Sequence, residues 1–280
     1  MPYSKIRPFY DFLNFLTKKS YIYSKFNVVE NLKIAAPNLD VVWKNKEQNF
    51  RNIEEKFAAV RADILVLPEM FSTGFYMQAD EIADQKEETL TWMRSFAKEK
   101  NIAVCGSASV KENKRFVNRF YFVEPSGEYQ YYDKRHLFSY SGEEKTYSPG
   151  KERVIVNYKD WRILLQVCYD LRFPVFSRNN GDYDAIFYVA NWPSTRIDAW
   201  KTLLKARAIE NQAYVIGINR IGIDGNNLEY PESSYGFFAD GKEISTVENG
   251  FFFANLNLEN LAKTRAKFPF LSDRDQFEIL

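Results

Sequence analysis

Hydrophobic positions along the chain follow two spacings, one typical of buried strands and one typical of helices. Leu32–Pro37 is a short apolar run, and residues 63–68 form a second one that ends at a proline, so both fit buried strands. Between these runs, apolar side chains recur at helical steps of three, four and seven residues, which predicts a helix. They are Trp43, Phe50, Ile53, Phe57 and Val60.

Strands predominate further along the chain, and several of them are expected to pair as hairpins. Turn sequences such as Pro125-Ser-Gly127 lie between segments rich in aromatic and β-branched residues. The predicted strands are 102–110, 115–124, 129–133, 154–158, 161–167, 185–190, 213–221, 235–239 and 250–256, and the predicted helices span about 90–97, 195–212 and 258–267. This order predicts an α/β fold with a mixed sheet or two packed sheets, covered by helices on the outside.

Composition and charge support a globular domain and argue against two kinds of partner. Of the 280 residues, 45% are hydrophobic and 27% charged, which is enough apolar material for a packed core. The 38 basic residues nearly balance the 37 acidic ones, so neither nucleic acid nor an anionic membrane is expected as a partner. No apolar run reaches the roughly 18 residues of a membrane helix.

The beginning of the chain differs in composition from the rest. Residues 1–28 are basic and aromatic, without the continuous apolar stretch and small-residue cleavage site of a secretory signal. We therefore expect an N-terminal extension over 1–28, a single domain over 29–280, and a cytoplasmic location.

Few residues are available for metal binding or for a histidine relay. The chain has two cysteines, Cys105 and Cys168, and one histidine, His136. A disulfide framework and a zinc site rich in His or Cys are therefore not expected, and no cofactor is predicted. A Ser-His-Asp or Cys-His relay would depend on His136 alone. Any cysteine chemistry thus points to a base other than histidine.

Two candidate reactive residues directly follow predicted strands. Cys168 follows the strand at 161–167 and precedes a predicted helix start at Pro174, where backbone N–H groups can lower a thiol pKa and hold an oxyanion. Taken alone, a cysteine here is more often buried and inert. Glu69 ends the strand at 63–68, where α/β enzymes place general bases, although capping or ion-pairing carboxylates also occur there.

Two charged residues in the middle of the chain complete the candidates. Lys134 follows the strand at 129–133, and a desolvated lysine can stabilise an oxyanion as a point charge. Glu143 lies nine positions later, in a segment that reads as a loop. Taken alone, each is more often a solvated surface charge.

Together, the sequence contexts of these four residues resemble the nitrilase superfamily of carbon–nitrogen hydrolases, from about residue 31 to the C-terminus. The matching contexts occur in the family's order: Leu67-Pro-Glu-Met-Phe71, Tyr132-Asp-Lys-Arg-His-Leu137, Val167-Cys-Tyr-Asp-Leu-Arg-Phe173, Ala190-Asn-Trp-Pro193 and Ala206-Arg-Ala-Ile-Glu-Asn-Gln212. The resemblance implies a four-layer α-β-β-α sandwich, usually paired into a homodimer or a higher homo-oligomer. It also implies a catalytic triad and a second glutamate, with Glu144 as an alternative for the latter. The implied catalytic residues are Glu69, Lys134, Cys168 and Glu143.

Within the superfamily, the contexts around the cysteine and the lysine resemble the omega-amidase branch. That branch implies hydrolysis of short dicarboxylate monoamides, such as 2-oxoglutaramate or succinamate, through a cysteine thioester. Under this resemblance Glu69 is the base, and Lys134 and the backbone N–H of Tyr169 hold the oxyanion. Two alternatives stay open: a hydrolase of N-carbamoyl amino acids or other short amides, and a catalytically silent oligomeric scaffold of the same fold.

Residues that could bind the substrate are less well defined by the sequence. Arg172 and Arg196 are candidates for binding a substrate carboxylate, although either could instead belong to a structural ion pair, which we favour for Arg172. Trp192 is a candidate wall of the pocket, and a packing role is its alternative. Arg207 and Glu210, three residues apart on a predicted helix, are expected to form a structural pair.

Overall fold

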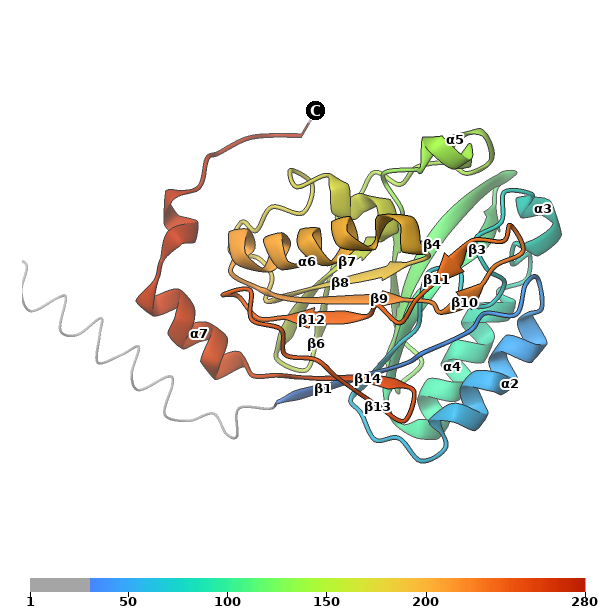
Figure 1. Cartoon of the computed structure of the whole chain (residues 1–280), viewed down its shortest axis with the longest axis horizontal. Helices are drawn as coiled ribbons and strands as arrows, with labels where there is room; N and C mark the ends of the chain where they lie inside the picture. The colour runs from blue at the N-terminus through green and yellow to red at the C-terminus, as the bar shows by residue number, and fades with distance from the viewer. Residues whose placement is uncertain (1–30, 280) are drawn as a thin grey trace, which may run out of the picture. The chain divides into compact units, whose positions relative to one another are not determined.

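The computed structural model describes residues 31–279, in which two β-sheets face each other and helices cover their outer sides (Figure 1). The larger sheet consists of β1 (Leu32–Pro37), β2 (Ile64–Val66), β3 (Ala103–Glu112), β4 (Arg115–Val123), β5 (Tyr129–Asp133), β13 (Thr246–Glu248) and β14 (Phe251–Leu256). The smaller sheet consists of β6 (Ile155–Tyr158), β7 (Trp161–Val167), β8 (Ala185–Ala190), β9 (Tyr214–Asn219) and β12 (Tyr235–Phe237). Their strand orders are β13-β14-β1-β2-β3-β4-β5 and β12-β9-β8-β7-β6. The predicted extension over 1–28 lies outside the described residues.

Helices and short turns make up the remaining elements. The helices are α2 (Lys46–Phe57), α3 (Ala79–Ile82), α4 (Glu88–Lys100), α5 (Glu143–Thr146), α6 (Ile197–Asn211) and α7 (Leu258–Lys267). The 3₁₀ turns are Ser139–Ser141, Cys168–Arg172, Ser194–Arg196 and Phe270–Asp273, and β10 (Gly222–Ile223) pairs with β11 (Glu229–Tyr230) in a separate hairpin. Among the described helices, none has the length and apolarity that crossing a membrane requires.

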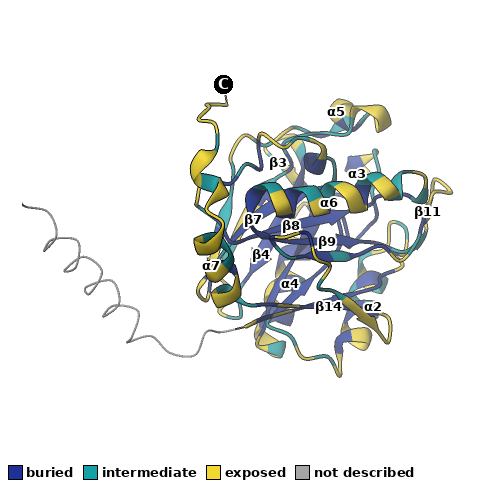
Figure 2. Ribbon diagram, turned by 60° about the vertical axis from the view of Figure 1, so that its left-hand side comes forward, coloured by how far each residue is buried: buried dark blue, intermediate teal, exposed yellow. Residues whose placement is uncertain are grey.

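The alternation of side chains along the strands produces the layers. In β2, Ile64 and Val66 pack in the cluster between the sheets, whereas Leu65 packs with the apolar faces of α2 and α4. In the smaller sheet, Leu164 faces the side of α6 and Leu165 faces the other sheet. Figure 2 shows buried strands between helices with exposed outer faces. The predicted four-layer α-β-β-α sandwich is confirmed.

Close packing of α6 against its sheet depends on one small residue. Gly217 lies in β9 below Leu204 and Trp200 of α6, and a Cβ atom at this position would overlap the Leu204 side chain. Glycine therefore sets how closely the helix approaches the sheet. This approach keeps α6 packed over the 3₁₀ turn that carries Cys168.

Parallel strands bring the candidate residues to one end of the sandwich. β1, β2 and β3 run parallel in one sheet, and β7, β8 and β9 run parallel in the other. Glu69 comes after β2, Cys168 directly after β7 and Asn191 directly after β8. Carboxyl ends of parallel strands are the usual place for the site of an α/β protein. The fold thus places residues far apart in sequence at one location.

One local prediction near Cys168 is wrong. The helix expected from Pro174 onward does not form; a 3₁₀ turn over Cys168–Arg172 is followed by irregular chain. The Asn179 side chain accepts hydrogen bonds from the backbone N–H groups of Gly181 and Asp182, which closes a turn where a helix would have continued. The predicted strands and longer helices elsewhere match the structure within a few residues.

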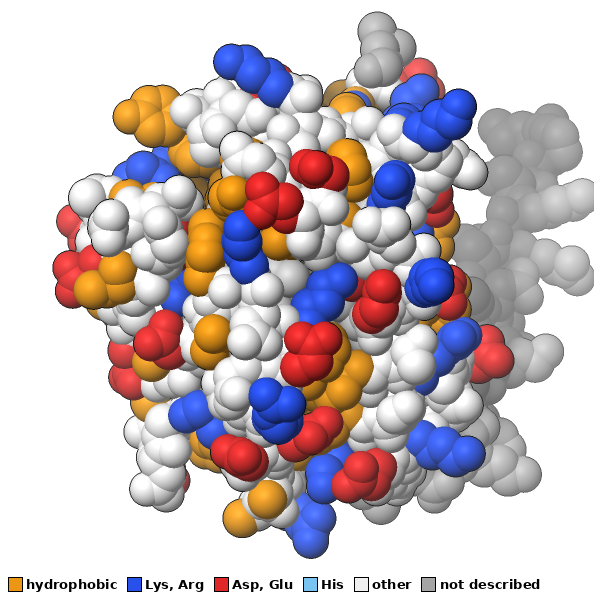
Figure 3. Space-filling model, turned by 90° about the vertical axis from the view of Figure 1, so that its right-hand side faces the viewer, with side chains coloured by type: hydrophobic (Ala, Val, Ile, Leu, Met, Phe, Trp, Pro, Cys, Tyr) orange, Lys and Arg blue, Asp and Glu red, His pale blue; other side chains and the backbone are white. Residues whose placement is uncertain are grey.

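Charges on the surface are mixed, as the near-balance in the sequence suggests. On the face in Figure 3, acidic and basic side chains are interspersed among neutral ones. The predicted pair on α6 is confirmed, with Arg207 Nη1 3.0 Å from Glu210 Oε1.

Candidate active site

Cys168 begins the turn after β7, with a φ of +44° that non-glycine residues rarely adopt. The residue lines a cavity of about 300 Å³. Burial raises the pKa of its thiol well above the usual range, and the nearby Glu69 carboxylate raises the pKa further while Lys134 opposes this. The α-helix whose N–H groups could lower this pKa does not form; a 3₁₀ turn begins at Cys168 instead, and the effect of burial dominates. A protonated thiol requires a base before it can attack.

Glu69 is completely buried beside that thiol, and donors surround its carboxylate. Oε1 accepts hydrogen bonds from Lys134 Nζ at 2.9 Å and from Asn118 Nδ2 at 2.8 Å. Oε2 accepts one from the backbone N–H of Asn191 at 2.9 Å. Besides burial, this carboxylate also raises the pKa of the Cys168 thiol, as expected for two groups that lie close together. Glu69 is therefore placed to take the proton of Cys168, as the sequence predicts for a base.

Lys134 is the buried cation of the site and lies between two carboxylates. Its Nζ is 2.9 Å from Glu69 Oε1 and 2.8 Å from Glu143 Oε2, and all three side chains are fully buried. Burial by itself lowers the pKa of Lys134, but attraction to the two carboxylates outweighs it, and the pKa is raised. The ammonium thus keeps its charge.

Glu143 holds the other side of the ammonium. Its Oε2 also accepts the backbone N–H of Phe138 at 2.6 Å, which fixes the carboxylate in place. Burial raises the pKa of Glu143, and Lys134 partly offsets the rise. Glu144, the alternative from the sequence, is exposed. The structure therefore brings Glu143, and not its neighbour, to the cluster.

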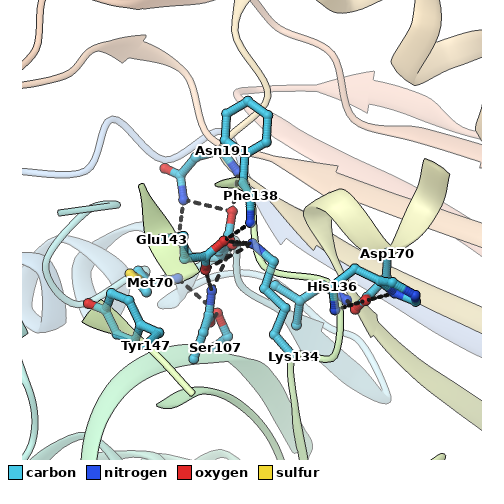
Figure 4. Close-up of polar contacts among 12 residues, drawn as sticks. Met70, Ser107, Lys134, His136, Phe138, Glu143, Tyr147, Asp170 and Asn191 are labelled. Atoms are coloured by element: carbon cyan, nitrogen blue, oxygen red, sulfur yellow. Dashed lines mark hydrogen bonds and ion pairs between the residues drawn. The ribbon is translucent and has the colours of Figure 1, made fainter. Parts of the chain in front are cut away.

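Sequence reasoning gave no role to Asn118, which joins the two carboxylates. Asn118 lies on β4 and donates from Nδ2 to Glu69 Oε1 at 2.8 Å and to Glu143 Oε1 at 3.3 Å. Its Oδ1 accepts the hydroxyl hydrogen of Ser107, whose oxygen in turn accepts the backbone N–H of Met70. Figure 4 shows this network around Lys134. The available signal was an asparagine next to Arg119 in the otherwise apolar and aromatic stretch 116–123 of β4.

The cavity beside Cys168 has aromatic walls and one basic residue in its lining. Tyr169, Trp192 and Arg196 line it, as expected for substrate-binding candidates. Among the described residues of the lining, Arg196 is the only Lys or Arg. The lining residues are Glu69, Phe75, Met77, Phe138, Ser141, Cys168, Tyr169, Asn191, Trp192, Pro193, Arg196, Asp224, Asn226, Leu228 and Tyr230.

Arg172, the other basic candidate, lies outside the cavity. It is exposed, and its guanidinium lies 5.0 Å from the ring centroid of Trp192. The indole N–H of Trp192 donates to the backbone oxygen of Arg196 at 2.7 Å. Trp192 therefore also fixes the backbone from which Arg196 reaches the cavity. Within residues 31–279, no group of three or more His, Cys, Asp and Glu side chains is arranged to hold a metal ion.

Known proteins share this arrangement of sequence and fold. The sequence model described as carbon-nitrogen hydrolase matches residues 33–266. The chain belongs to the carbon–nitrogen hydrolase family. An omega-amidase, YafV, from Yersinia enterocolitica is 44% identical over 90% of this chain and 100% of its own length. A 2-oxoglutaramate amidase from Bacillus subtilis is 32% identical, covering 86% and 96%.

A solved structure of the family agrees with the fold. The crystal structure of a CN-hydrolase superfamily protein from Xanthomonas campestris superimposes with a TM-score of 0.86 at 38% identity. It covers 90% of this chain and 100% of the other, and that protein has an arsenic adduct in its active site. The family assignment thus extends over the whole sandwich and includes both carboxylates, Lys134 and Cys168.

Proposed function

We propose that this protein is an omega-amidase that releases ammonia from short dicarboxylate monoamides such as 2-oxoglutaramate and succinamate. The observation that carries this proposal is a buried Glu69–Lys134–Glu143 cluster beside Cys168, in a small cavity whose described lining residues include one Lys or Arg, Arg196. Relatives from Yersinia enterocolitica and Escherichia coli carry the name omega-amidase, and two others the name 2-oxoglutaramate amidase.

The first step is attack by the thiol. Glu69 accepts the proton from Cys168 Sγ, and the sulfur forms a bond to the amide carbon while the carbonyl electron pair moves to oxygen. The oxyanion lies next to the Lys134 ammonium and the backbone N–H of Tyr169, the residue after the nucleophile. Two preorganised donors in a water-poor site stabilise this charge.

Collapse of the intermediate releases ammonia, and water completes the cycle. The oxyanion reforms the carbonyl, the carbon–nitrogen bond breaks, and protonated Glu69 transfers its proton to the departing nitrogen. Glu69 then accepts a proton from water, whose oxygen attacks the thioester carbon. Cys168 leaves as a thiolate and recovers its proton from Glu69, and a dicarboxylate is the second product.

Glu143 orients the ammonium and does not react in this scheme. Its bonds to Lys134 Nζ and to the backbone N–H of Phe138 fix the lysine relative to the cavity. The positive charge of Lys134 would otherwise be drawn toward Glu69 alone. Glu143 therefore keeps the lysine available to the oxyanion.

Arg196 is the residue that we assign to the distal carboxylate of the substrate. It lines the cavity, and its guanidinium lies 5.3 Å from the ring centroid of Phe138, another wall residue. A cavity of about 300 Å³ suits a compound of about ten heavy atoms, whose two ends would lie at Cys168 and Arg196. A guanidinium at the far end favours a carboxylate over a neutral amide.

Self-association and cellular location complete the proposal. Exposed apolar side chains gather around the end of α6 and the C-terminal segment, including Val175, Ile209 and Phe270. Two surface grooves there share Phe270, and a homodimer would cover them. Light scattering of the purified protein measures this state directly. Both cysteines are free, which is compatible with a cytoplasmic location.

A panel assay of ammonia release tests the function. Wild-type protein is expected to turn over succinamate and 2-oxoglutaramate well above glutamine and N-carbamoyl amino acids. Cys168→Ala should abolish release, whereas Cys105→Ala is the matched control, because Cys105 lies in the core between the sheets. Preference for carbamoyl substrates would favour that branch of the family, and residual turnover by folded Cys168→Ala would contradict the nucleophile assignment.

A further inference from the structure

Asp170 lies two residues after Cys168, is completely buried, and has no part in the proposed mechanism. Its carboxylate accepts four hydrogen bonds, two on each oxygen. Oδ2 accepts the backbone N–H of Val167 at 2.9 Å and the hydroxyl of Tyr132 at 2.8 Å. Oδ1 accepts the backbone N–H of His136 at 3.0 Å and its ring Nδ1–H at 2.7 Å. A carboxylate can accept no more than about this number, so its whole capacity is used.

The four donors come from the two segments that carry the reactive groups. Val167 immediately precedes Cys168, while Tyr132 and His136 lie two residues before and two residues after Lys134. One carboxylate therefore links the turn of the nucleophile to both flanks of the lysine. Figure 4 shows His136 bonded to Asp170 beside the Lys134 side chain.

We propose that Asp170 is a positioning residue that fixes the Lys134 ammonium relative to the Cys168 sulfur. The proposal rests on the mechanism above, in which that separation decides how well the oxyanion is held. Cys168 has a φ of +44°, and such a conformation persists only when neighbouring contacts hold it. The hydrogen bond from the backbone N–H of Val167 to Asp170 closes this turn. On the segment that carries Lys134, the ring side chains of Tyr132 and His136 provide donors.

The lone histidine belongs to this linkage. The His136 ring stacks on Phe173 with centroids 4.1 Å apart and meets Phe176 edge-on at 5.7 Å. His136 is not among the residues that line the cavity. Because a carboxylate only accepts, ring nitrogen Nδ1 carries the hydrogen that Asp170 binds. Stacking and this bond together hold the backbone just beyond Lys134.

Asp184 serves as a control that distinguishes a positioning role from ordinary structural support. Asp184 is also a buried carboxylate with several donors, and it binds Arg162 and Arg265. It lies directly before β8, whereas Asn191 of the active site directly follows β8. Asp184→Asn should therefore lower stability without a specific effect on the reaction.

The experiment compares Asp170→Asn with Asp184→Asn in the full chain. Asp170→Asn places an N–H₂ group against some of the four donors and so breaks those hydrogen bonds. If the Lys134 ammonium then shifts by about 1 Å relative to the Cys168 sulfur, kcat for succinamate is expected to fall by about 100-fold. KM should change by less than about threefold, since neither segment binds the distal carboxylate. Asp184→Asn should keep kcat within about threefold of wild type, whatever its melting temperature. An equal loss of kcat in both variants overturns the proposal.

Three further measurements remain decisive if Asp170→Asn does not fold or if the substrate is wrong. Tyr132→Phe removes one donor and keeps the ring, so kcat should fall by about threefold to tenfold at constant KM. In a double-mutant cycle, Tyr132→Phe should cost much less in a Lys134→Met background, because the two act on one separation. If the two substitutions instead lower kcat by independent factors that multiply, the result contradicts the proposal.

Iodoacetamide labelling of Cys168 needs no substrate. Slower labelling in Tyr132→Phe supports the linkage even if the amidase assignment fails, and an unchanged rate opposes it.

Discussion

Replacing Lys134 by methionine removes the cation from a fully buried cluster and keeps the length of the side chain. Glu69 and Glu143 would then face each other across Asn118 without any positive charge between them. Each carboxylate has zero exposed surface, so water cannot replace the lost ammonium. The variant leaves two uncompensated acceptors in the interior, which is the costly way to break a buried ion pair.

The expected cost follows from the burial of all three groups. Removing one partner of a buried pair costs about 3–5 kcal/mol, a large part of the 5–15 kcal/mol that typically holds a domain together. A domain of this size loses about 2–4 °C in Tm per kcal/mol, so Lys134→Met should melt about 6–20 °C lower than wild type. The control is Lys201→Met, because Lys201 pairs with Glu243 where both side chains are nearly half exposed. A surface pair of that kind is worth about 0–1 kcal/mol.

The loss of stability in Lys134→Met should also depend on pH, and the structure determines the direction of that dependence. Burial already raises the pKa of Glu143, and Lys134 counteracts that rise. Without the lysine the pKa rises further, so the folded variant binds a proton that the unfolded chain releases at neutral pH. Stability then falls as pH increases through the raised pKa and is recovered below the unfolded value near 4.3. The difference in Tm between wild type and Lys134→Met should therefore be smaller at pH 5 than at pH 8.

Thermal melting followed by circular dichroism at pH 5 and pH 8 measures both effects. Activity gives an independent reading, because the charge is needed when the oxyanion forms and kcat should fall much more than KM rises. The reasoning is refuted if Lys134→Met melts within 2 °C of Lys201→Met at pH 8 (about 0.5–1 kcal/mol). A larger difference at pH 5 than at pH 8 would equally refute the assigned sign.

The remaining predictions concern the cavity and the packing of α6. Arg196→Gln should raise KM for succinamate by about 10–100-fold, since a charged hydrogen bond is worth about 1.5–3 kcal/mol, while Arg172→Gln should stay within about threefold. Initial-rate kinetics on both variants check this, and equal effects would remove the assignment of Arg196. Gly217→Ala should destabilise the fold by about 1–3 kcal/mol without altering KM, because the new methyl group meets Leu204. Urea denaturation measures that loss, and an unchanged midpoint would contradict the packing.

Hydrophobic spacing was sufficient to predict most of the longer strands and helices, whereas the four-layer arrangement was implied by the family resemblance. Buried strands such as β8 have unbroken apolar sequences, and α2 has apolar positions at helical steps, so both elements follow from local pattern. Short elements were missed for the same reason: α3 and α5 have four residues each, too few to show a period. The helix predicted from Pro174 onward was wrong for another reason. The turn at Asn179 is made by hydrogen bonds to its side chain, and the spacing of hydrophobic residues carries no information about such bonds.

The sequence predicted which residues meet in the candidate site but not what holds them there. Glu69, Lys134, Cys168 and Glu143 stand in recognisable contexts, and the structure places them together. Asn118 and Asp170 act through partners that are distant in sequence, such as Glu69 at 49 positions and His136 at 34. Such pairings depend on how the strands of the two sheets align in space. The pattern of hydrophobic and polar residues along the sequence therefore cannot predict them.

The raised pKa of Cys168 is compatible with catalysis because of the charge of the whole cluster. Glu69 and Glu143 contribute two negative charges and Lys134 one positive, so the buried group carries −1 while the thiol is protonated. Moving the thiol proton to Glu69 transfers that negative charge to sulfur and leaves the total at −1. Attack on the amide then moves it to the oxyanion. Burial penalises loss of the proton to bulk water, but a transfer within the cluster adds no new buried charge. In the proposed mechanism, the environment that makes Cys168 a poor acid toward solvent thus still permits proton transfer to Glu69.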